Sequence, residues 1–244
     1  MFNGPGAHAI TYPIGAKADF LNVLLVLSER FSLCPSGKRK PVAVGTRGDR
    51  REAIAAFKSW HPTVRAIVNL LPEDEVGDDV SEGKIQKWDI FDMHENPAPY
   101  YARGRVCLAG DAAHATSPHL GSGAGFGVED ALVLAEMLQV VNNKVKDGVT
   151  VSDGAARDAK QRIQSRAILC TTALQAYNEI RYDRTKWLPG ASREACALFE
   201  WEHEAARDPE RFGEEISQRF YQIWHYDVSG MVQEALRRFS EKID

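Results

Sequence analysis

Residues Gly104 to Ala131, GRVCLAGDAAHATSPHLGSGAGFGVEDA, decide how this sequence folds. The stretch opens with a short apolar run, Val106 to Ala109, that stops at Gly110-Asp111. A cluster of glycines follows, and a helical pattern starts near Val128. A strand that ends in a carboxylate and leads through a glycine-rich turn into a helix is typical of α/β proteins that bind a polar, anionic cofactor. The carboxylate can accept hydrogen bonds from sugar-like hydroxyls, and the glycines let the backbone approach a flat ring or a phosphate.

The composition is that of an ordinary globular protein. The chain has 244 residues, of which 44% are hydrophobic and 26% charged, enough for one sizeable core or a large domain with a helical appendage. A formal net charge of -4 gives no electrostatic reason to expect nucleic acid or an anionic membrane as a partner. No apolar run reaches about 18 residues, and the first residues lack the pattern of a secretory signal. We therefore expect a cytoplasmic protein.

The spacing of the cysteines also indicates a cytoplasmic protein. Cys34, Cys107, Cys170 and Cys196 lie far apart and form no Cys-x-x-Cys pair. This spacing predicts free thiols in a reducing compartment and no metal site.

The elements before the deciding stretch are mostly strands and short helices. Residues 7–14 and 20–27 are rich in β-formers and are separated by a short polar turn, which predicts an antiparallel hairpin. Helical spacing then predicts two helices, over 50–60 and 63–71, divided by His61-Pro62. Residues 85–92 alternate as a strand does.

The elements after the deciding stretch are helices. We expect them over 157–186, 194–206, 212–226 and 228–239, with a break at 147–153. A doubly wound sheet needs several alternating βα units, and this sequence shows one; it also contains no Gly-x-Gly-x-x-Gly. We divide the chain into a sheet domain (1–100), a strand-turn-helix segment (101–145) and a C-terminal helical region (146–244).

The deciding stretch resembles the second FAD-binding motif of the aromatic-ring hydroxylases, the single-component flavoprotein monooxygenases of the salicylate hydroxylase type. The shared pattern is Gly-Asp-Ala-Ala-His from Gly110, then Pro118, then a Gly-x-Gly turn, then Glu-Asp-Ala from Glu129. Three weaker matches occur in the family's order. They are WDIFD at 88–92, the segment from Asp49 to Trp60-His61-Pro62, and YNEIRYDR at 177–184.

The resemblance implies the C-terminal half of such an enzyme. The expected fold is α+β with α/β character, a partial FAD-binding fold in which an antiparallel substrate-domain sheet precedes the strand-turn-helix and the C-terminal helices. The implied reaction uses FAD, NAD(P)H and O₂ to hydroxylate a phenolic or other aromatic small molecule. The alternative is a truncated, non-catalytic remnant, or a subunit that needs another polypeptide to complete the FAD site. The expected partners are the small aromatic substrate and either a missing N-terminal half or further copies in a homo-oligomer.

The same resemblance assigns the cofactor site. Asp111 would accept a hydrogen bond from the ribityl chain of FAD, or instead cap a turn. Gly121, Gly123 and Ala124 would face the flavin ring and stabilise negative charge on it, or simply form a turn that needs positive φ. Pro118 would place its carbonyl beside the reaction site, or serve as a turn proline.

Other side chains receive smaller roles. Tyr12 is the candidate for orienting and deprotonating a phenol, with plain strand packing as the alternative. We expect His114 to order its loop, and Arg181 and Arg184, three residues apart on a helix, to pair with carboxylates. Glu129 and Asp130 suit the helix N-terminus and are assigned no chemistry.

Overall fold

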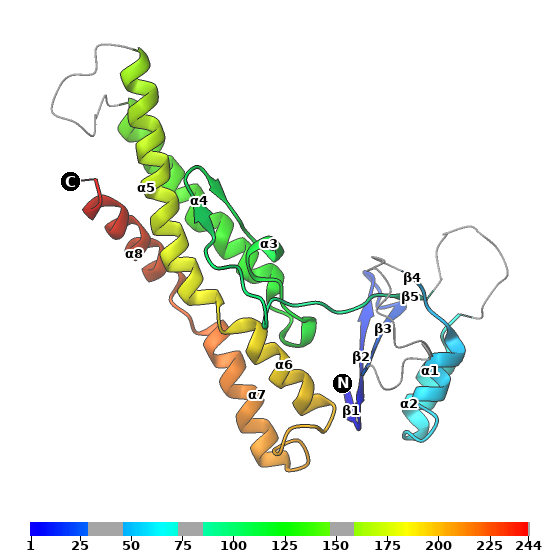
Figure 1. Cartoon of the computed structure of the whole chain (residues 1–244). Coiled ribbons are helices and arrows are strands. Elements are labelled where there is room, and N and C mark those ends of the chain that lie inside the picture. Colours follow the sequence, from blue (N-terminus) through cyan, green and yellow to red (C-terminus); the bar gives the residue numbers. More distant parts are fainter. Residues whose placement is uncertain (29–45, 73–84, 147–158, 244) are drawn as a thin grey trace. The chain divides into compact units, whose positions relative to one another are not determined.

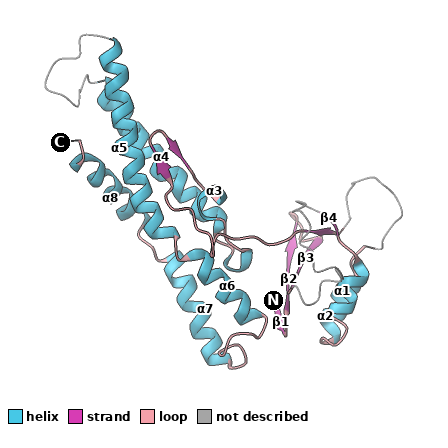
Figure 2. Ribbon diagram, viewed as in Figure 1, coloured by secondary structure: helices cyan, strands magenta, loops and turns pink. Residues whose placement is uncertain are grey.

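The computed structural model describes residues 1–28, 46–72, 85–146 and 159–243 (Figure 1). Contacts divide the chain into two compact units. Unit 1 comprises residues 1–90 and 194–215, and unit 2 comprises residues 91–193 and 216–244. The division predicted from the sequence, at residues 100 and 145, remains a prediction. The mixture of small antiparallel sheets and helices confirms the predicted α+β class (Figure 2).

The sheet of unit 1 has three antiparallel strands in the order β1-β2-β3. They are β1 (Phe2–Gly4), β2 (Ala7–Ile14) and β3 (Phe20–Leu27), so the predicted hairpin is confirmed with its bounds. Gly15 has φ +89° in the hairpin turn, a conformation that suits glycine. The register pairs Tyr12 with Asn22, so these two side chains share one face of the sheet.

Two short helices cover the other face of this sheet. Helix α1 (Arg50–Ala56) begins at Asp49, whose side chain accepts from the backbone N–H of Arg51, and α2 (Pro62–Asn69) starts with a proline in its first turn. A core of alanines, valines and one phenylalanine joins helices and strands: Ala7, Ala9, Ala53, Phe57, Val64 and Val68.

The prediction of a strand over residues 85–92 is mostly wrong. Only β5 (Gln86–Lys87) is extended and paired, with β4 (Thr46–Arg47). Trp88, Ile90 and Phe91 follow as irregular chain with exposed side chains. Alternation predicts a strand only where a partner strand satisfies the backbone, and this segment has none beyond Lys87 among the described residues.

Unit 2 is built on long helices. Helices α4 (Gly123–Lys146), α5 (Ala159–Thr185) and α8 (Val228–Glu241) pack around a core that includes Val133, Met137, Leu169, Tyr177 and Phe239. The predictions for α5 and α8 are confirmed within two residues. The break predicted at 147–153 lies outside the described residues.

Two further helices start earlier than predicted. Helix α6 spans Leu188–Phe199, not 194–206, because Pro189 is accommodated in a first helical turn. Helix α7 spans Pro209–Trp224, not 212–226, again with a proline at its start.

The deciding stretch differs from its prediction at both ends. Its strand is only β7 (Val106–Cys107), paired with β6 (Ala102–Arg103). Its helix begins at Gly123, so the glycines at 123, 125 and 127 lie inside α4 and not in a turn before it. No described helix is long and apolar enough to cross a membrane. The three described cysteines are free thiols, and the described residues contain no metal-binding cluster.

Candidate cofactor site

The site lies in unit 2, where the chain leaves β7. Leu108 donates its N–H to the Tyr101 carbonyl (2.7 Å), and its own carbonyl accepts from the Tyr177 hydroxyl (2.8 Å). Two residues later Gly110 adopts φ +57°, ψ −140°, a conformation open essentially to glycine. The chain then enters the short helix α3 (Asp111–His114), whose first residue is Asp111.

A buried carboxylate, Asp130 on α4, fixes this turn. Its Oδ2 accepts from the Gly110 N–H (2.8 Å) and contacts Nε2 of His114 (2.7 Å), and its Oδ1 accepts from Nε of Arg181 (2.6 Å). Burial by itself would raise the pKa of Asp130, but the hydrogen bonds from His114, Gly110 and Arg181 outweigh it and lower that pKa. Asp130 is therefore held as an anion that clamps Gly110 to α4 and α5.

The clamp extends along α5 through two arginines. Arg181 donates to Glu129 Oε2 (2.6 Å) and to the Phe126 carbonyl (2.9 Å), and Arg184 donates to Glu129 Oε1 (3.1 Å). The Arg184 guanidinium also lies over the rings of Tyr226 (3.7 Å to the centroid) and Phe126 (4.4 Å). The prediction that both arginines pair with carboxylates is confirmed.

His114 sits inside this network. It is 2% exposed, and its ring contacts the rings of Tyr101 and Phe126. Its Nδ1 is buried without a partner among the described residues. A ring so enclosed cannot reach a substrate, and its bond to Asp130 orders the loop, as the sequence indicates.

The glycine turn completes the site. Pro118 starts the 3-10 turn η2 (Pro118–Leu120), and Gly121 ends it with φ +61°. Ser122 then donates its hydroxyl to the Leu120 carbonyl (2.8 Å), and Gly123 opens α4. The first helical N–H bond runs from Phe126 to the Ser122 carbonyl, so the amides of residues 123–125 point along the helix axis without a helical acceptor.

The surface so formed is open and made of small residues. Asp111, Pro118, Gly121 and Ala124 are exposed, and Gly123 is half-buried. A Cβ added at Gly110, Gly121 or Gly125 would meet nothing within 4 Å, whereas one at Gly127 would lie 3.6 Å from the Gly110 Cα. Helix α4 therefore packs against the end of the strand and leaves its N-terminus uncovered.

These features fit a flavin nucleotide. Small residues allow a flat ring to approach, free amides at a helix N-terminus favour negative charge, and an exposed carboxylate can accept from hydroxyls. The structure thus brings Asp111, Pro118, Gly121, Gly123 and Ala124 into one unit. Their contacts with a cofactor stay a prediction.

Tyr12 lies in unit 1. It stands on β2 opposite Asn22, and its side chain is 50% exposed. Its role toward a substrate also stays a prediction.

Sequence reasoning assigned no chemistry to Asp130, which the structure shows to be the centre of the clamp. A signal was present. Phe126, Asp130, Val133 and Met137 follow one another at helical spacing, and all four are buried. A carboxylate on the apolar face of a helix needs a buried partner, and Arg181 is the cation that meets it.

Comparisons with known proteins agree with this picture. The family model described as "FAD binding domain" matches residues 16–161. The FAD-dependent monooxygenase eupB of Phoma sp is 41% identical over 236 residues, covering 95% of this chain and 48% of that protein. Salicylate hydroxylase asL1 of Sarocladium schorii is 41% identical over 256 residues, covering 98% of this chain and 47% of that protein. The chain thus spans about half the length of these curated relatives.

A solved structure shows the same fold. The structure titled "Salicylate hydroxylase substrate complex" superposes with a TM-score of 0.71 at 24% identity, over 96% of this chain and 48% of that one.

Proposed function

The chain belongs to the FAD-binding domain family, and from this premise we propose that it serves an FAD-dependent monooxygenase that hydroxylates a phenolic or other aromatic small molecule with NAD(P)H and O₂. The observation that carries the proposal is the open surface of Asp111, Gly121 and Ala124, held in place by the buried Asp130 clamp. When bound, the flavin supplies the redox chemistry with O₂.

The residues of this chain bind and orient. The Asp111 carboxylate would accept hydrogen bonds from the hydroxyls of the cofactor's sugar-like chain. The N-terminal amides of α4 would stabilise negative charge on the ring. The Pro118 carbonyl would border the space where substrate meets the ring.

Tyr12 would act on the substrate. A tyrosine hydroxyl beside a phenol can hold the phenolic oxygen and help remove its proton, which makes the ring a better nucleophile. The half-exposed Tyr12 side chain, with the Asn22 side chain on the same face, is available for this role.

The experiment supplies the chain with FAD, NADH or NADPH, and a panel of phenols that includes salicylate, under ¹⁸O₂. The expected product carries one labelled oxygen by mass spectrometry. The Tyr12→Phe variant should lower product formation while leaving FAD affinity unchanged. Labelled product formed equally by the wild type and this variant would contradict the role of Tyr12.

A second candidate is a subunit whose site is completed by another polypeptide, or a remnant without catalysis. The exposure of Asp111, Gly121 and Ala124 is compatible with completion by another polypeptide, because unit 2 by itself would cover only one side of a cofactor held there. Under this alternative the chain alone makes no labelled product. Co-expression with a polypeptide that carries a Gly-x-Gly-x-x-Gly unit would restore it if the chain is a subunit and would not if it is a remnant.

A further inference from the structure

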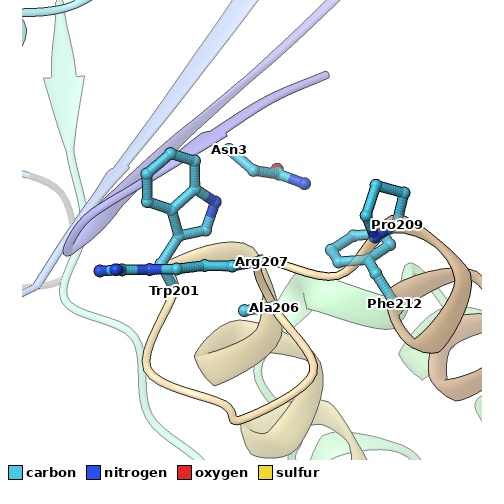
Figure 3. A pocket seen from close by; sticks show the side chains of 6 residues that line it. All are labelled: Asn3, Trp201, Ala206, Arg207, Pro209 and Phe212. Carbon is cyan, nitrogen blue, oxygen red and sulfur yellow. The ribbon is translucent and has the colours of Figure 1, made fainter.

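A pocket lies in unit 1, where the chain passes from α6 to α7. It is an open hollow of about 560 Å³, a size suited to a small molecule. Its lining comprises Asn3, Trp201, Ala206, Arg207, Pro209 and Phe212 (Figure 3). None of these residues belongs to the cofactor surface, which lies in unit 2.

The backbone conformation at Trp201 indicates a functional role for this side chain. Trp201 has φ +61°, and Glu202 donates its N–H to the Ala197 carbonyl (2.8 Å). This is the helix ending in which the left-handed residue is usually glycine, and a large side chain there carries strain. The indole is nevertheless 40% exposed, so packing does not account for the choice. Strain of this kind gathers where a side chain serves a ligand.

A cation beside the pocket has no ion-pair partner in the part of the chain that the structure describes. The Arg207 guanidinium lies over the Trp201 ring, 5.6 Å from its centroid, and makes no ion pair with any described residue. The carboxylates near it in sequence are engaged elsewhere. Asp208 accepts from the N–H groups of Glu210 and Arg211, and Glu204 pairs with the Arg211 side chain (2.5 Å).

An unpartnered acceptor completes the lining. The Oδ1 atom of Asn3 on β1 is buried and has no hydrogen-bond partner among the described residues. Figure 3 shows the Asn3 amide extending toward the space between Trp201 on one side and Pro209 with Phe212 on the other. A buried acceptor without a partner costs free energy, and a ligand that donates a hydrogen bond removes that cost.

We propose that this pocket binds a planar aromatic carboxylate that carries a hydroxyl or amino group. The ring would lie between Trp201 and Phe212, and its hydroxyl or amino group would donate to Asn3. The exposed Arg207 side chain, which Figure 3 shows against Trp201 on the side away from Phe212, would turn to meet the carboxylate. The aromatic side chains favour a ligand that carries a ring, and the Arg207 cation, which has no ion pair among the described residues, favours a carboxylate over a neutral ring.

The test follows the indole N–H signal of Trp201 by NMR in the full chain, with benzoate, 3-hydroxybenzoate and benzyl alcohol as probes. A Trp201→Phe variant assigns the signal. Benzoate should shift it saturably, 3-hydroxybenzoate should bind more tightly, and benzyl alcohol should bind at least about tenfold more weakly than benzoate.

Variants locate the effect. Arg207→Met keeps the side-chain length and should weaken benzoate about tenfold, whereas Arg103→Met, also exposed but in unit 2, should change nothing. Asn3→Leu should abolish the preference for 3-hydroxybenzoate. Trp201→Gly keeps a residue that the turn favours and should abolish binding without unfolding the chain. Tyr12→Phe should leave these affinities unchanged, which separates this pocket from the proposed substrate site.

Benzoate that leaves the Trp201 signal unmoved would overturn the proposal. So would equal affinities of wild type and Arg207→Met, or a benzyl alcohol affinity that matches that of benzoate.

Discussion

Replacing Arg181 by methionine should destabilise unit 2 strongly. The side chain is fully buried, and its guanidinium donates to Asp130 Oδ1 (2.6 Å), to Glu129 Oε2 (2.6 Å) and to the Phe126 carbonyl (2.9 Å). Methionine matches much of the volume, so the change removes charge more than packing. Asp130, itself 0% exposed, keeps only Gly110 and His114 as partners. Breaking a buried pair by deleting one partner costs about 3–5 kcal/mol, and we expect a loss of that size.

The pH dependence of that loss follows from the carboxylate. The folded-state pKa of Asp130 is lowered below its ordinary value of 3.8, so its ion pairing contributes stability above the ordinary pKa and loses it as pH falls through the folded pKa. The difference between wild type and Arg181→Met should therefore be constant near neutral pH. It should shrink below about pH 4.

Urea denaturation followed by circular dichroism, from pH 3 to pH 8, measures both quantities. The matched control is Arg237→Met on α8, where the arginine is 55% exposed and pairs with Glu234. This control should behave as wild type, because solvent screens an exposed pair. A loss below about 1 kcal/mol for Arg181→Met, or a loss equal to that of the control, would refute the clamp.

Three further predictions concern the two units. Gly121→Ala should lower the free energy of unfolding, measured thermally, by about 1 kcal/mol, because φ is +61° at this position. Gly125→Ala, inside α4 and equally open around its Cβ, should not lower it, and equal changes in the two variants would contradict this reason. Phe57→Ala should destabilise unit 1 by about 3–5 kcal/mol, because the ring is 1% exposed in its core, and the 75%-exposed Leu70 replaced by alanine should cost little; similar losses would show that this core is not as described. Gly127→Val should destabilise by about 1–3 kcal/mol, because a Cβ there already lies 3.6 Å from the Gly110 Cα, and an unchanged melting temperature would place α4 farther from the strand end.

Local sequence signals predicted the parts of the fold that depend on local chemistry. The hairpin over 7–14 and 20–27 was found with its bounds because alternation and a polar turn specify it without help from distant residues. Helices α1 and α2 were divided correctly at His61-Pro62. The start of α4 at Gly123 was not predicted, because glycines usually indicate the end of a helix. In the structure the Ser122 carbonyl accepts the first helical hydrogen bond and Gly127 packs on Gly110, so the helix can begin at Gly123.

The candidate site divides in the same way. Asp111 and the glycines were recognisable because one contiguous motif carries them. The Asp130 clamp joins residues 51 positions apart, Asp130 and Arg181, and only the packing of α4 on α5 reveals it. The pocket at Trp201 depends on the left-handed backbone conformation of this residue, which no local sequence pattern predicts.

The central claim is that Asp111 and the N-terminus of α4 bind FAD. The direct measurement is an FAD titration of the purified chain, followed by the flavin absorbance band and repeated after desalting. We expect saturable binding. Asp111→Asn should weaken it about tenfold or more, and Asp89→Asn, an exposed control in unit 1, should leave it unchanged. A chain that stays colourless after incubation with FAD, or an Asp111→Asn variant that binds as tightly as wild type, would contradict it.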